Sequence, residues 1–97
     1  MDIKTILEGQ LATVQLTGRL DTITAPVLQQ TITDLAQVVD LILDFKGVEY
    51  ISSAGLRVVL FAQKKMQQVG SMKVINVCEE VMQVFEITGF ADILTIE

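Results

Sequence analysis

The chain has 97 residues, of which 51% are hydrophobic and 20% are charged, and its net charge is −5. This length fits one domain over residues 1–97, and the excess of carboxylates argues against nucleic acid or an anionic membrane surface as a partner. There is no His and a single Cys, which excludes His-based catalytic triads, a typical zinc site and an internal disulfide. Without a signal-peptide pattern or an apolar run of roughly 20 residues, we expect a cytoplasmic protein with no metal and no cofactor.

The first part of the chain predicts a β-hairpin followed by a helix. Strands are expected over residues 2–8 and 11–17, because apolar and polar side chains alternate in the second segment. Gly18 is expected to end the second strand. A helix is predicted over residues 24–39, with Thr24 as its N-cap. Its apolar residues recur at helical spacing and share one face: Ala25, Leu28, Ile32, Leu35 and Val39.

The rest of the chain alternates strands with helices. The expected elements are, in order, a buried strand (41–45) broken by Lys46-Gly47, a short extended segment (48–51), a helix (54–69), a strand (73–77), a helix opened by Glu79 and closed by Gly89, and a last short strand (93–96). The order ββαβαβαβ implies a single α/β domain. Its sheet should be mixed but mostly parallel, entered by the N-terminal hairpin, with about three helices packed on it.

Two serines stand where a buried strand gives way to the helix predicted over 54–69. Ser53 is an ordinary N-cap residue, whose hydroxyl would accept an amide N–H of the first turn and contribute about 1 kcal/mol. Ser52 would then make only a loop hydrogen bond. Gly55 costs about 0.5–1 kcal/mol relative to Ala within a helix, so it indicates a close approach by another backbone or by a partner.

This segment resembles the signature of the STAS-domain anti-sigma factor antagonists. Three stretches carry the resemblance, in the family's order and over nearly the whole chain: Leu16-Thr17-Gly18-Arg19-Leu20-Asp21, Ile51-Ser52-Ser53-Ala54-Gly55-Leu56 after the strand ending in Asp44-Phe45, and Val81 to Phe90. The fold that the resemblance implies is a STAS domain, which agrees with the α/β order of elements.

The resemblance also implies a mechanism of partner switching in transcription regulation. The unphosphorylated protein would bind an anti-sigma factor kinase and so release a sigma factor. The ATP-dependent kinase would switch it off by phosphorylating a serine, and a serine phosphatase would restore it. In the family the acceptor lies two residues before the Gly of the Gly-Leu pair, which is Ser53 here. The family often has Asp before the acceptor, where this chain has Ser52, so Ser52 is an alternative acceptor.

We expect the partner-binding surface at the start of the helix over 54–69 and on the loop of Asp21. A kinase must reach Ser53, Gly55 leaves room for another chain, and the family fold implies that the Asp21 loop lies beside the serine. The expected contacts are Asp21, Ser52, Ser53, Ala54, Gly55 and Arg57. Asp21 has a second interpretation as a cap of the first helix. Lys64 and Lys65 are expected on a solvated face near the far end of the later helix.

Two other classes of function compete with the antagonist. A STAS adaptor of a transporter or lipid-trafficking complex needs no phosphoacceptor, and Ser53 would then be only a helix cap. An enzyme ranks last, because the sequence offers no nucleophile–base pair, no metal-binding set and no phosphate-binding Gly loop.

Overall fold

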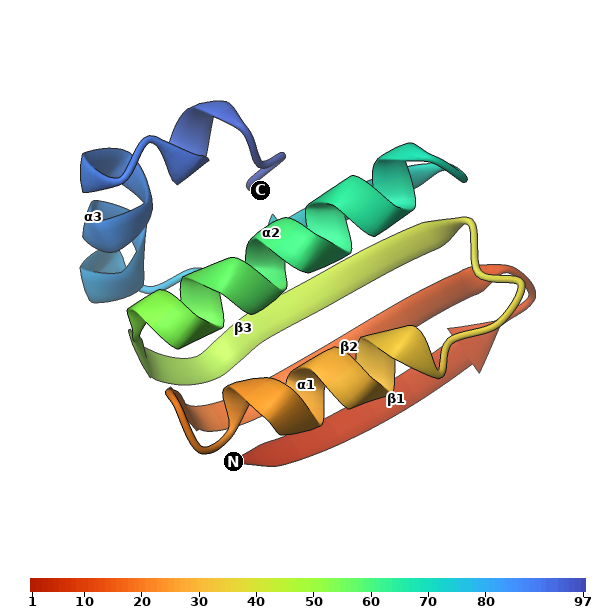
Figure 1. Cartoon of the computed structure of the whole chain (residues 1–97), viewed down its shortest axis with the longest axis horizontal. Helices are drawn as coiled ribbons and strands as arrows, with labels where there is room; N and C mark the ends of the chain where they lie inside the picture. The colour runs from red at the N-terminus through yellow and green to blue at the C-terminus, as the bar shows by residue number, and fades with distance from the viewer.

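Four strands form one mixed sheet in the computed structural model, which describes residues 1–97 (Figure 1). β1 (Asp2–Glu8) and β2 (Leu11–Leu20) form an antiparallel hairpin. β3 (Asp40–Ile51) then pairs in parallel with β2, and β4 (Ser71–Ile75) pairs in parallel with β3. The strand order is therefore β1-β2-β3-β4, and the predicted mixed, mostly parallel sheet with an N-terminal hairpin is confirmed.

The helices and the sheet enclose one core. α1 (Ala25–Thr33) and α2 (Ser53–Gln67) lie side by side over the sheet, and α3 (Glu79–Ile87) lies at the end of β3 (Figure 1). Alternate strand residues point to opposite faces of a sheet, and those on the helix-bearing face are buried: Ala12, Val14, Leu16, Leu41, Leu43, Phe45, Met72 and Val74. This alternation is the one that the sequence predicts for β2.

α3 packs over the part of β3 that β4 does not reach. β4 pairs only with the residues from Asp40 to Asp44. Beyond that point the ring of Phe85 packs between two others, 6.1 Å from Phe45 and 6.4 Å from Phe90 between centroids. Gly89 follows the helix with a φ of 82°, a left-handed conformation that favours glycine and ends the helix as predicted.

β3 runs without a break through Lys46 and Gly47, so the predicted interruption is wrong. Gln15 of β2 pairs with Asp44 of β3, and Thr17 pairs with Gly47. Between these pairs β2 advances two residues and β3 advances three, so β3 has one extra residue, which forms a β-bulge. A Cβ on Gly47 would lie 2.9 Å from the Cα of Thr17. Glycine therefore allows the two strands to approach here. Gly18 likewise lies inside β2, beside a second shift of register, and does not end the strand.

α1 and the last predicted strand depart furthest from their predicted bounds, whereas α2 (Ser53–Gln67) and β4 (Ser71–Ile75) each end two residues earlier than predicted. α1 stops at Thr33 rather than at residue 39, because β3 must begin beside the start of β2 and residues 34–39 carry the chain back to it. Lys65, expected on a solvated face, instead reaches this end of α1, where its Nζ donates to the carbonyl oxygen of Ile32 at 2.8 Å. The last strand, predicted over 93–96, is wrong: only a single bridge between Val74 and Ile96 forms there, after a short 3-10 helix (Phe90–Asp92).

Candidate functional site

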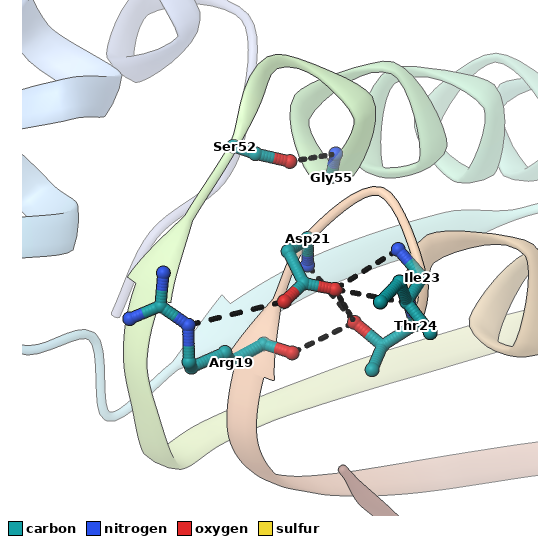
Figure 2. Close-up of polar contacts among 6 residues, drawn as sticks. All are labelled: Arg19, Asp21, Ile23, Thr24, Ser52 and Gly55. Carbon is teal, nitrogen blue, oxygen red and sulfur yellow. Dashed lines mark hydrogen bonds and ion pairs between the residues drawn. The ribbon is translucent and has the colours of Figure 1, made fainter.

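Two loops meet at the carboxyl ends of the neighbouring parallel strands β2 and β3. One loop carries Asp21 into α1, and the other carries Ser52 into α2 (Figure 2). The backbone N–H of Ser52 donates to the carbonyl oxygen of Leu20 at 2.9 Å. The sheet thus brings together the two segments that the resemblance associates with partner binding.

The two adjacent serines have different surroundings. Ser52 is the N-cap of α2, with extended backbone and an Oγ that accepts the N–H of Gly55 at 3.3 Å (Figure 2). Ser53 is the first residue of the helix and is exposed, and its hydroxyl has no hydrogen-bond partner. The expectation that Ser53 caps the helix is therefore wrong. The helix begins one residue earlier than predicted, which moves the cap to Ser52 and leaves the hydroxyl of Ser53 free.

Gly55 is buried beneath this surface. A Cβ at this position would lie 2.8 Å from Cγ of Leu20 and 2.9 Å from the carbonyl oxygen of the same residue. The close approach indicated by the sequence is thus made by the protein's own β2. Gly55 supports the contact between the two loops and offers no surface to a partner.

Asp21 organises the loop before α1. Its Oδ1 accepts the N–H of Thr24 at 3.1 Å and that of Ile23 at 3.0 Å (Figure 2). Thr24, expected as the N-cap, makes no capping bond of its own to the helix and instead donates its hydroxyl to the carbonyl oxygen of Arg19 at 2.7 Å. The amide of Thr24 makes the largest contribution to lowering the pKa of Asp21. Asp21 therefore holds the turn before α1, but the two amides that it accepts precede the helix, so capping of the helix itself by Asp21 is not observed.

The two arginines at this end of the molecule are held differently. Nε of Arg19 lies 3.8 Å from Oδ2 of Asp21, and its guanidinium carbon lies 4.0 Å from the ring centroid of Tyr50. Arg57 is exposed, and its only hydrogen bond runs from Nε to the carbonyl oxygen of Ser53 at 3.5 Å. Arg19 is thus engaged on both sides, whereas Arg57 lies along the first turn of α2.

A groove of about 560 Å³ continues from this site between α1 and α2. Its lining comes from both helices and the loop before α1: Thr22, Ala25, Pro26, Gln29, Gln30, Thr33, Ala54, Arg57 and Val58. On the same stretch of chain, Ile23 and Val27 have 83% and 56% of their surface exposed. Sequence reasoning missed these two residues, although Val27 is an apolar side chain outside the buried stripe of an amphipathic helix and was a usable signal.

The structure brings five of the six expected contact residues to one surface and places the sixth, Gly55, beneath it. We refer to Asp21, Ile23, Ser53 and Arg57 as the candidate docking surface, or docking surface for short. No three His, Cys, Asp or Glu side chains are grouped so that they could hold a metal ion. None of the helices has the length and apolarity required to cross a bilayer.

Comparisons with known proteins identify the family and the fold. The model of the STAS domain family matches residues 3–97. The anti-sigma-B factor antagonist of Bacillus subtilis is 39% identical over 85 residues, which cover 86% of this chain and 78% of that protein. The anti-sigma factor antagonist SpoIIAA in its unphosphorylated form has a TM-score of 0.85 at 18% identity, over 99% of this chain and 88% of that one. The Bacillus SpoIIAA in its phosphorylated form has a TM-score of 0.77 at 18% identity, over 99% and 91%.

Proposed function

The chain belongs to the STAS-domain family of anti-sigma factor antagonists, and we propose that it works by serine-controlled partner switching. In its unphosphorylated form it binds an anti-sigma factor kinase, which then releases a sigma factor. The kinase uses ATP to phosphorylate Ser53 and so ends the binding, and a serine phosphatase reverses the step. The use of ATP implies that this exchange takes place in the cytoplasm. The protein's own part is binding rather than catalysis.

The free, exposed hydroxyl of Ser53 is the observation that carries this proposal. A kinase needs an acceptor that it can reach, and Ser53 has no hydrogen bond to break first. The hydroxyl of the alternative acceptor, Ser52, is half-buried and accepts the amide of Gly55. Phosphorylation of Ser52 would therefore disrupt the cap of α2, whereas phosphorylation of Ser53 leaves the helix intact.

A phosphate on Ser53 changes the docking surface more than it changes the fold. It adds about −1.5 to −2 charges at a helix N-terminus, where the helix dipole tolerates negative charge. A partner seated on the exposed apolar side chain of Ile23 would meet this charge at the edge of its contact. Desolvating a dianion against a partner surface that offers no matching cation is costly, so the modified protein leaves the kinase while remaining folded.

Mass spectrometry locates the acceptor. The protein is incubated with its cognate kinase and ATP, and the tryptic peptide from Gly47 to Arg57, which holds Tyr50, Ser52 and Ser53, is fragmented. We expect phosphate on Ser53, loss of phosphorylation in Ser53→Ala, and phosphorylation in Ser52→Ala. Phosphate mainly on Ser52 would contradict the assignment.

A binding titration against the kinase tests the docking surface. Ser53→Asp, Asp21→Lys and Ile23→Asp should each weaken binding by about tenfold or more, as loss of a central contact does, with unchanged circular dichroism. Lys64→Glu is the matched control, because Lys64 is an exposed residue of α2 far from Ser53. Protection from amide exchange confined to the helix-free face of the sheet or to residues 79–88 would favour the adaptor function instead.

A further inference from the structure

Ser53 and Arg57 form a pair along one face of α2. They are four residues apart within the helix, which begins at Ser53, and residues at this spacing are neighbours on the helix surface. Side chains in a helix also tilt toward its N-terminus. Arg57 follows this direction, since its Nε lies 3.5 Å from the carbonyl oxygen of Ser53. The guanidinium is therefore within reach of any group attached to the Ser53 hydroxyl.

Arg57 is also the available cation at this end of the molecule. The chain has two ion pairs, Arg19 with Asp21 and Lys73 with Glu97, so Arg57 has no carboxylate partner. The other nearby arginine, Arg19, is held by the carboxylate of Asp21 and by the ring of Tyr50. A new anion at Ser53 can thus recruit Arg57 without breaking an existing ion pair.

We propose that Arg57 binds the phosphate of phosphorylated Ser53 and that this pairing withdraws the guanidinium from the docking surface. The inference rests on the proposed phosphorylation of Ser53. An anion four residues before a cation is the favourable order on a helix, and the planar guanidinium matches two phosphate oxygens at once. The kinase then loses a cationic contact at the same time as it meets the phosphate. Arg57 acts as a positioning residue that holds the phosphorylated state in one arrangement.

The test measures the second pKa of the phosphate, which a paired cation lowers. Phosphoserine is incorporated at position 53 of the full chain during translation, so no kinase is needed, and the phosphate is titrated by phosphorus NMR. We expect Arg57→Gln to raise this pKa by about 0.3–0.7 pH unit, which corresponds to the free energy of an exposed ion pair. Arg57→Lys should retain at least half of the lowering. In about 1 M salt, where the Debye length is about 3 Å, the difference between wild type and Arg57→Gln should shrink.

Arg19→Gln is the matched control, since it removes the other nearby guanidinium. It should shift the phosphate pKa by less than half as much as Arg57→Gln. Equal shifts in the two variants, or no shift in Arg57→Gln, would overturn the pairing. If the cognate kinase leaves Ser53 unmodified, the proposed function fails by that separate assay, while the titration still reports on Arg57.

Discussion

Exchanging Ser52 for Ala removes the side-chain cap of α2 and should destabilise the protein. The Oγ of Ser52 accepts the amide of Gly55, a part-buried donor, at 3.3 Å. Loss of an N-cap costs about 0.5–2 kcal/mol. This bond is longer than the usual N–H···O distance of about 2.9–3.0 Å, so we expect a cost of about 1 kcal/mol. For a domain of this size that corresponds to a fall of about 4–8 °C in the melting temperature.

Urea unfolding measures this difference, with Ser53→Ala as the control. The midpoint for Ser52→Ala should fall while the slope stays constant, which identifies a change in stability rather than in the unfolded state. Ser53→Ala should stay within about 0.5 kcal/mol of wild type, because its hydroxyl makes no hydrogen bond. The two assays thus distinguish the roles of the two hydroxyls. Ser52→Ala should be less stable but still phosphorylated, whereas Ser53→Ala should be as stable as wild type but not phosphorylated. A loss of stability in Ser53→Ala equal to that in Ser52→Ala would refute the assignment of the cap.

Three further substitutions test the structure around the site. Asp21→Asn should lower the urea midpoint at pH 7, and the difference in midpoint from wild type should fade below about pH 4. The pKa of Asp21 in the folded protein lies below its ordinary value. The stabilisation by the charged carboxylate is therefore complete above the ordinary pKa and is lost as pH falls through the folded pKa. A difference that is constant from pH 7 to pH 2 would contradict the role of the charge. Gly55→Ala should lower the free energy of unfolding by about 1–3 kcal/mol, because the new Cβ would lie 2.8 Å from Cγ of Leu20. A variant as stable as wild type would refute the close approach. Lys65→Ala should lower the free energy of unfolding by about 1 kcal/mol, because it removes the hydrogen bond to the end of α1. Lys64→Ala should leave the stability unchanged, and equal losses in the two variants would contradict the contact of Lys65.

The local pattern of the sequence was sufficient for the order of elements as far as α3. Alternating residues such as Val14 and Leu16 identify a strand with one buried face, and Leu28 and Ile32 identify a helix with one buried stripe. Gly89 marks the end of the last α-helix, where its left-handed φ of 82° is observed. These signals are carried by residues within a few positions of each other, so a single sequence contains them.

The site was predicted as a set of neighbouring segments, but the roles within it were not. Whether Ser52 or Ser53 caps α2 depends on a single residue's backbone angles, which the packing of the two loops decides. The reason for Gly55 lies in Leu20, which is 35 positions away in the chain and in contact only because β2 and β3 pair.

The remaining differences have the same origin. Lys65 binds the end of α1, which lies 33 positions away in the sequence. The bulge at Gly47 lies where β3 closely approaches Thr17 on the adjacent strand. Both depend on contacts between segments that are distant in the chain. No local propensity encodes which backbone atoms such segments will present to each other, because that is settled only when the sheet and helices pack.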